Sequence, residues 1–235
     1  MSQATKQQSA FLSFPIPTGF LFSFEEDQHP SKVGGWNQSS LRLDNSGTHF
    51  GFVQSGSATL STSHGRFEAS PGMYFAIPGQ AEIHGSGDGL VVTRLGYRGF
   101  FHLGGPIEQT GRLRYIDGCT DSLLISPVVW GDPCLNLLSI PPQTDQTAHT
   151  HPSIRVGMIV RGEGMCRVAD GDVPLVPGQM FIIRPNGLHS FHTRDSSLLI
   201  IAWHPDSDFG PTHETHPMLN RTLVSGRPVN ANGEH

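Results

Sequence analysis

Three histidines are the residues of this chain whose types and spacing best suit chemistry. His149 and His151 are separated by one residue, and His189 opens a later apolar stretch. Residues i and i+2 of a β-strand point to the same face, so His149 and His151 would present their imidazoles together. A third imidazole beside them would complete a ligand set that suits Zn, Fe, Cu, Ni or Mn and leaves coordination positions open. The sequence therefore predicts a metal site, provided that the three side chains meet.

The residues between the HxH pair and His189 predict a series of short antiparallel strands. The stretches that suit such strands are 156–160, 164–168, 173–176 and 180–183. Gly162 would end the first of them, and Pro185-Asn186-Gly187 would turn the chain before His189. Such a meander can carry His189 back over the strand that bears His149 and His151.

These residues resemble the two sequence motifs of the cupin superfamily. The positions that keep the family spacing are His149, His151 and Gly162 in the first motif and Gly178 and His189 in the second. The departures are Arg155 at the glutamate position, Arg184 at the expected proline, Pro185 and Gly187 one place late, and a missing initial glycine. The resemblance implies an all-β jelly roll, the double-stranded β-helix of the cupins, with a metal held by His149, His151 and His189.

A repeat supports the same fold independently. Turn and strand positions of the first half match those of the second half at one offset without a gap. The matched pairs are Gly56 with Gly162, Gly65 with Gly171, Pro71 with Pro177, Gly72 with Gly178, Phe75 with Phe181 and Ile77 with Ile183. Because self-similarity of this size marks a duplicated unit, we predict two tandem cupin barrels, a bicupin. The predicted units are residues 12–108 and 109–208, followed by a C-terminal tail over 209–235.

The first predicted unit lacks the ligand set. At the same offset, His149, His151, Arg155 and His189 correspond to Leu43, Asn45, His49 and Ile83. Only His49 could bind a metal, because His84 lies one place from the expected ligand and a slip of one residue turns a strand side chain to the opposite face. We expect the first barrel to have lost its metal and to serve the domain interface or dimerisation, or to bind something without metal.

Charge at the predicted site favours an anionic substrate. Three neutral imidazoles leave a divalent ion more positive than the three histidines and one glutamate usual in cupins. If Arg155 points into the barrel, we interpret it as a clamp for a substrate carboxylate; if it points outward, it pairs with a surface acid. The shared parity of residues 149, 151 and 155 favours the inward orientation, although Pro152 interrupts the strand.

The sequence also suggests which residues surround the three histidines and which lie away from them. The apolar residues expected to contact substrate are Met158, Phe181, Ile183 and Phe191, for which core packing is the simpler interpretation. His192, three residues after His189, is expected on the opposite strand face. The remaining histidines of the polar C-terminal segment, His204, His213 and His216, are expected to be exposed.

The composition excludes several function classes. Only 15% of the 235 residues are charged, the net charge is −5, and arginine and lysine are scattered, so we expect no nucleic-acid binding. The N-terminus lacks a signal-peptide core and no apolar stretch is long enough to span a bilayer, which predicts a cytoplasmic protein without membrane contact. The three dispersed cysteines indicate neither a disulfide framework nor a zinc ribbon.

Three functional hypotheses follow. The first is a metal-dependent enzyme for a small organic acid or dicarbonyl substrate. Resemblance to cupin dioxygenases with three-histidine iron sites makes iron the first choice and oxygen-dependent cleavage the leading reaction, while Zn, Ni or Mn would suit a Lewis-acid isomerase or decarboxylase. The second is a non-enzymatic small-molecule-binding cupin, and the third is a structural cupin without metal, against which the intact ligand set argues. We also expect a homodimer.

Overall fold

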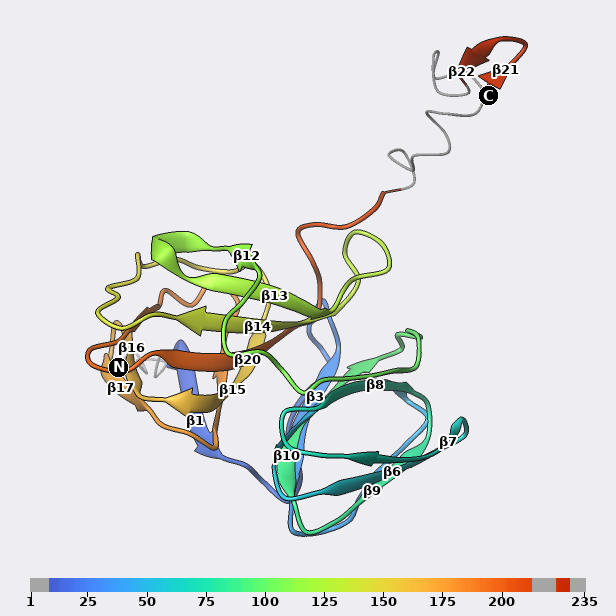
Figure 1. Ribbon diagram of the computed structural model, residues 1–235, viewed down its shortest axis with the longest axis horizontal. Helices are drawn as coiled ribbons and strands as arrows, with labels where there is room; N and C mark the ends of the chain where they lie inside the picture. Colours follow the sequence, from blue (N-terminus) through green and yellow to red (C-terminus); the bar gives the residue numbers. More distant parts are fainter. Residues whose placement is uncertain (1–8, 213–222, 229–235) are drawn as a thin grey trace, which may run out of the picture.

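The structure is a computed structural model that describes residues 9–212 and 223–228 (Figure 1). In these residues every regular element is a β-strand except one 3-10 turn, η1 at Ile116–Gly118. The predicted all-β fold class is thereby confirmed. No helix in the described part of the chain is long and apolar enough to cross a membrane. His213, His216 and the remainder of the predicted tail lie outside the described residues.

Apart from β1 (Phe11–Pro15), the strands of the first half form one large and one small antiparallel sheet. They are β2 (Gly19–Phe24), β3 (Ser31–Asn37), β4 (Leu41–Leu43), β5 (Gly47–Ser55), β6 (Ala58–Thr62), β7 (Gly65–Ala69), β8 (Tyr74–Pro78), β9 (Ala81–His84), β10 (Asp88–Leu95) and β11 (His102–Gly104). The six-stranded sheet has the order β11-β8-β5-β10-β3-β2, and the four-stranded sheet has the order β4-β9-β6-β7.

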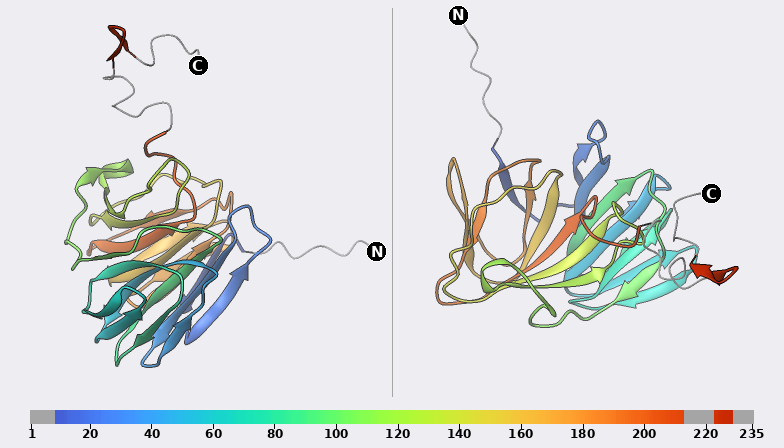
Figure 2. Two further views of the ribbon diagram at one scale, coloured as in Figure 1. Left: turned by 90° about the vertical axis from the view of Figure 1, so that its right-hand side faces the viewer. Right: turned by 90° about the horizontal axis from the view of Figure 1, so that it is seen from above.

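The second half repeats this arrangement. Its strands are β12 (Leu113–Arg114), β13 (Thr120–Ile125), β14 (Cys134–Ile140), β15 (Arg155–Gly162), β16 (Gly164–Val168), β17 (Gly171–Leu175), β18 (Gln179–Ile183), β19 (Ser190–His192) and β20 (Leu198–His204), and a separate hairpin joins β21 (Leu223–Val224) to β22 (Arg227–Pro228). The seven-stranded sheet has the order β1-β18-β15-β20-β14-β13-β12, and the three-stranded sheet has the order β17-β16-β19. Figures 1 and 2 show the two halves side by side.

Three apolar cores lie between the four sheets. One fills the space inside each half, and the third joins the two large sheets, where Phe50 of β5 meets Trp203 of β20 with ring centroids 6.0 Å apart. Each large sheet therefore has a core on both faces, and strands such as β5 and β15 are buried almost continuously. Strands of the small sheets, such as β4 and β9, alternate buried and exposed residues because one of their faces meets solvent.

The first strand belongs to the second half. β1 pairs antiparallel with β18, and the ring of Phe11 stacks on Phe181 at a centroid distance of 5.2 Å. The predicted unit 12–108 therefore needs a correction at its start, because residues 11–15 complete the edge of the seven-stranded sheet. An exposed strand edge is a liability that a strand from elsewhere in the chain can cover. The division at residues 108 and 109 stays a prediction.

The sequence repeat reappears as repeated packing. Phe75 lies over Gly51 in the first half, and Phe181 lies over Gly157 in the second half. At each glycine, an ideal Cβ would stand 2.1 Å from the ring Cζ atom. Both rings need a neighbour without a side chain, which explains why the two glycines occupy strand interiors where glycine otherwise weakens a strand.

We expect Gly157→Ala to lower the free energy of unfolding by about 2 kcal/mol, because the added methyl group overpacks the core against the Phe181 ring. Gly51→Ala should cost a similar amount through Phe75. Urea unfolding followed by tryptophan fluorescence measures both. An unchanged midpoint in either variant would mean that its ring moves aside without loss of packing.

Candidate metal centre

The segment that carries His149 and His151 runs antiparallel to the chain around His189. The backbone N–H of His149 donates to the carbonyl oxygen of His189 at 3.0 Å, and the reverse bond is 3.1 Å long. A second isolated bridge joins Asp145 to His192. This pairing places the side chains of His149 and His189 directly across from each other.

The HxH pair does not lie on a regular strand, which corrects the sequence prediction. Between β14 and β15 only the two isolated bridges, at Asp145 and His149, have β pairing. Pro141, Pro142 and Pro152 occupy this connection, and proline has no N–H to donate to a sheet. The imidazoles still converge because the bridge to His189, rather than strand alternation, sets their position.

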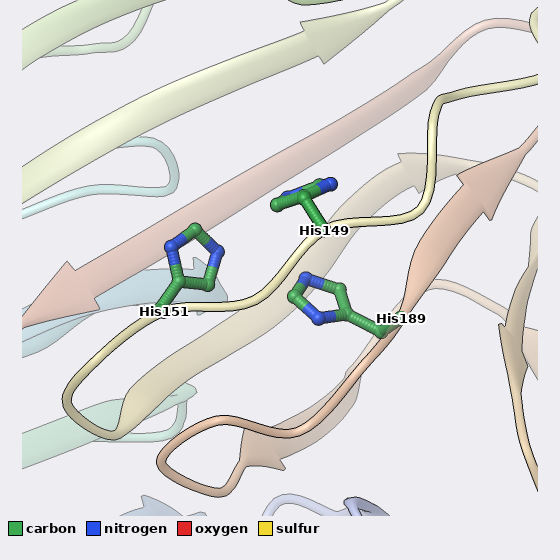
Figure 3. A group of neighbouring side chains, drawn as sticks. All are labelled: His149, His151 and His189. Carbon is green, nitrogen blue, oxygen red and sulfur yellow. The ribbon is translucent and has the colours of Figure 1, made fainter.

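The three imidazoles point toward one another (Figure 3). The ring centroids lie 4.5 Å apart for His149 and His189, 5.1 Å for His149 and His151, and 5.2 Å for His151 and His189. One ligand atom from each residue falls within 4.8 Å of the others. His189 is only 1% exposed, whereas His149 and His151 are half-buried. In the described residues, this is the cluster of histidine, cysteine and acidic side chains with metal-binding geometry.

Backbone contacts leave the outer nitrogens of two rings free. Nδ1 of His149 lies 2.8 Å from the carbonyl oxygen of Thr147, and Nδ1 of His189 lies 2.9 Å from that of Gly187. A carbonyl oxygen only accepts, so each Nδ1 carries a hydrogen, and Nε2 is the nitrogen through which each ring would bind a metal. The buried Nε2 of His189 has no hydrogen-bond partner. An unsatisfied buried acceptor beside two other imidazoles fits a metal ion, and metal-bound histidines usually have such a second contact.

Burial keeps two of the rings neutral. It lowers the pKa of His151 to about 3, with further contributions from the charges of Arg155, His189 and His149. Burial also lowers the pKa of His189 to about 4, assisted by His149 and Arg155 and opposed by the bond to Gly187. Neutral imidazole is the form that binds metal, so both ligands are available at neutral pH.

Arg155 is buried and paired. It is 4% exposed and begins β15, and its Nη1 lies 3.3 Å from Oδ1 of Asp206 and 3.1 Å from the carbonyl oxygen of Ile154. Ser153 also contacts both Nη1 and Asp206 through its hydroxyl group. The guanidinium is thus held by a carboxylate of the same chain, while its buried Nε has no partner. Its role as a substrate clamp stays a prediction.

Of the apolar residues predicted to contact substrate, three share the side of the sheet that faces the histidines. Phe181, Ile183 and Phe191 belong to the core inside the second half, and the Phe191 ring lies 5.6 Å from that of His189. Met158 requires a correction, because it faces the core between the two large sheets. Odd-numbered residues of β15 point into the second half and even-numbered ones point away, so Met158 lines the opposite face.

His204 lies near the site, which the sequence pattern did not predict. Instead of being exposed, it ends β20 and is half-buried, with its ring 6.5 Å from that of His151. Burial, and then the charges of Arg155 and His151, lower the pKa of His204 well below its usual range. The apolar stretch that precedes it, 198–203, was the signal that would have placed it on a strand.

Two further histidines have structural partners. His49 is fully buried, with Nδ1 2.8 Å from the hydroxyl oxygen of Thr93 and Nε2 2.9 Å from the carbonyl oxygen of Asp44, so neither nitrogen is free for a metal. His192 lies between Ser190 and Asp145, at 2.7 and 2.9 Å. Both contacts agree with the expectation that His192 faces away from His189.

Asp117 of η1 anchors the ligand segment. Its carboxylate accepts bonds from the backbone N–H of Thr147 at 2.7 Å and from the Thr147 hydroxyl at 3.2 Å. The carbonyl oxygen of Thr147 is the group that orients His149. Asp117 therefore acts on the metal site through one intermediate residue.

We expect Asp117→Ala to weaken metal binding about tenfold, the lower end of the effect of losing an outer-sphere partner. Competition with a chromogenic chelator measures the affinity. Asp117→Asn is the matched control, because it keeps one acceptor oxygen for Thr147 and should lose less. Equal affinity in Asp117→Ala and the unmodified protein would show that His149 is oriented without this contact.

Comparison with known proteins finds a family match in the part of the chain that holds these residues. Residues 136–205 match the family model for the cupin domain. The matched residues include His149, His151 and His189, and they run from within β14 to just beyond β20. No curated protein sequence matches the chain.

Solved structures with the cupin fold match most of the chain. A cupin 2 conserved barrel domain protein from Leptotrichia buccalis is 10% identical with a TM-score of 0.57, over 85% of this chain and 91% of that one. Oxalate decarboxylase from Bacillus subtilis is 11% identical with a TM-score of 0.54, over 88% and 80%. Salicylate 1,2-dioxygenase from Pseudaminobacter salicylatoxidans is 10% identical with a TM-score of 0.54, over 74% and 70%. At such identities the likeness shows the fold alone.

Proposed function

We propose that this chain is a metal-dependent cupin enzyme that acts on a small organic acid or dicarbonyl compound in its second half. The observation that carries the proposal is the convergence of His149, His151 and His189 within 4.8 Å, with two rings oriented by backbone carbonyl oxygens. A structural cupin would not need an unsatisfied buried nitrogen such as Nε2 of His189.

The three histidines would hold a divalent transition metal through their outer nitrogens. Iron is our first choice, and zinc, nickel or manganese are alternatives. When bound, such an ion would polarise a coordinated carboxylate or carbonyl oxygen and, if redox-active, would support oxidative cleavage of the substrate. Three protein ligands leave positions for substrate, as in catalytic rather than structural sites.

The protein groups around the site favour an anionic substrate. Neutral imidazoles do not offset the charge of the ion, and the guanidinium of Arg155, although paired with Asp206, keeps a buried Nε without a partner. Phe181 and Phe191 would shield the reacting atoms from water. Two solved structures of the same fold carry the names of carboxylic acids, salicylate and oxalate, which supports this substrate class.

We further propose that the chain is a bicupin that works as a homodimer in the cytoplasm. Each half pairs one large sheet with one small sheet, and both halves have the same glycine–phenylalanine packing. Its residues at the ligand positions, Leu43 and Ile83, are buried in apolar core, and His49 is satisfied. The first half would then support the second through the shared core.

Elemental analysis of the protein purified without a histidine tag tests the proposal. We expect near-stoichiometric metal that is lost in the double variant His149→Ala/His151→Ala. If the metal is iron, oxygen uptake with a panel of small carboxylates and diketones should identify an oxygenase substrate. Zinc, nickel or manganese would instead direct assays toward isomerisation and decarboxylation without oxygen. Absence of metal from both proteins would overturn the proposal and favour a binding protein without metal.

A further inference from the structure

Asn136 of β14 and Asp121 of β13 form a polar pair on the inner wall of the second half. On β14, Leu138 and Ile140 pack into the core inside this half, whereas Leu135 and Leu137 pack between the two large sheets. Side chains alternate along a strand, so Asn136 points inward with Leu138. Its Nδ2 donates to Oδ2 of Asp121 at 2.8 Å.

Two acceptor oxygens of this pair have no partner. Oδ1 of Asn136 and Oδ1 of Asp121 are both buried without a hydrogen bond, and Asn136 is only 5% exposed. Burial also raises the pKa of Asp121. An unsatisfied buried polar group costs free energy that water or a ligand can restore. Both free atoms accept hydrogen bonds, so the missing group must be a donor.

The pair shares a wall with Arg155 and His204, which lie near the histidine cluster. Asn136 lies opposite Ala202 of β20, which lies opposite Gly157 of β15, and Arg155 is two residues from Gly157 on the same face. The strands β14 and β15 are separated by β20 alone, which puts their backbones about 10 Å apart. His204, two residues after Ala202, has its ring 6.5 Å from that of His151.

Two residues of β20 on this wall are less buried than their neighbours. Ala202 and His204 are half-buried although β20 is a central strand, whereas Ile201 and Trp203, which face the other core, are 0% exposed. Ala202 contributes only a methyl group to this wall. A small molecule could therefore span from the metal centre to Asn136.

We propose that Asn136 and Asp121 bind the hydrogen-bond-donating end, a hydroxyl or amino group, of a small carboxylic acid whose carboxylate lies at the histidine centre beside Arg155. This inference rests on the proposed function and narrows its substrate class. The enzyme selects acids that carry a donor a few bonds away from the carboxylate, because only a donor satisfies the two free oxygens.

Calorimetric titration of the metal-loaded protein with matched acids tests the inference. The probes are 3-hydroxypropanoate against propanoate and 4-hydroxybutanoate against butanoate. Acids with the hydroxyl group next to the carboxylate are omitted, because they chelate a metal without help from the protein. We expect the hydroxy acid of at least one pair to bind about tenfold more tightly than its parent acid.

Variants show whether the polar pair causes the preference. Asp121→Leu/Asn136→Leu should bind both members of the pair equally, and Asn136→Leu alone should reduce the preference if the double variant does not fold. Ser139→Ala is the matched control, because Ser139 is buried on β14 at a position of opposite parity, and it should keep the full preference.

The outcomes separate this inference from the proposed function. If parent and hydroxy acids bind the unmodified protein equally, or if the preference survives in the variants, the inference is overturned while the metal-dependent function stands. If the metal-loaded protein binds none of the four acids, the inference and the proposed anionic substrate class fail together.

Discussion

His189→Ala will remove the metal and leave the fold intact. His189 is the buried member of the ligand set, and its Nε2 has no protein partner to lose. The remaining pair, His149 and His151, would bind a divalent ion far more weakly, because open sites of this kind use three protein ligands. We expect the bound metal to fall from near one equivalent to less than about a tenth, measured by plasma emission spectrometry after gel filtration.

His192→Ala is the matched control for this prediction. His192 is buried on β19 three residues after His189, but its nitrogens contact Ser190 and Asp145 instead of the ligand set. The variant should keep its full complement of metal. Stoichiometric metal in His189→Ala, with the circular dichroism of the unmodified protein, would contradict the three-ligand site.

Asp206→Ala will strongly destabilise the protein. Asp206 pairs with the buried guanidinium of Arg155 at 3.3 Å, and its other oxygen lies 3.6 Å from Nε2 of His29. Without this carboxylate, Arg155 keeps a buried charge with no counterion. Removal of one partner from a buried pair costs about 3 kcal/mol or more in the free energy of unfolding. Urea unfolding monitored by tryptophan fluorescence measures the loss.

The double variant Arg155→Met/Asp206→Leu is the control for charge. It removes both members of the pair and fills their volume with apolar groups, so it should be more stable than Asp206→Ala. If the two variants unfold at the same urea concentration, lost packing rather than an unpaired charge explains the effect. Asp206→Ala should also weaken metal binding, because the charge of Arg155 would then act on the site without compensation.

Arg155 changes the charge beside the three histidines. An arginine stands where the cupin motif has a glutamate, so a positive charge takes the place of a negative one near the histidine cluster. Asp206 compensates that charge from the end of the domain, and Arg94 reaches the same region from the first half by donating to the carbonyl oxygen of Pro205 at 3.4 Å. Both halves of the chain thus contribute to the surroundings of the site.

The cluster of three histidines and the all-β fold could be predicted from the sequence because both depend on local patterns. The spacing of His149, His151 and His189 and the turn residues around Gly162 and Gly178 indicate short strands and a possible metal site without reference to distant contacts. The repeat could also be recognised from residue types alone. In the structure it reappears as Phe75 and Phe181, each packed on a glycine of its own half.

Only the tertiary structure shows which side chains of the large sheets point into a barrel and which point toward the other half. β15 is apolar on both faces because each large sheet lies between two cores, so its sequence has no alternation that marks an inner side. Met158 was therefore assigned to the wrong face, and the orientation of Asn136 could not be chosen. The sequence of a strand that is buried on both faces shows that the strand is buried, but it does not show which side chains point to which face.

Contacts between distant segments were likewise beyond the sequence. Three examples are the ion pair of Asp206 with Arg155, the hydrogen bond from Asn136 to Asp121, and the pairing of β1 with β18. Each joins residues that come together only in the folded chain. The sequence by itself determined which residues could bind a metal and what kind of fold would hold them. Tertiary structure alone decided which charges lie near the histidines and which buried acceptors have no partner, because those depend on groups brought together from distant parts of the chain.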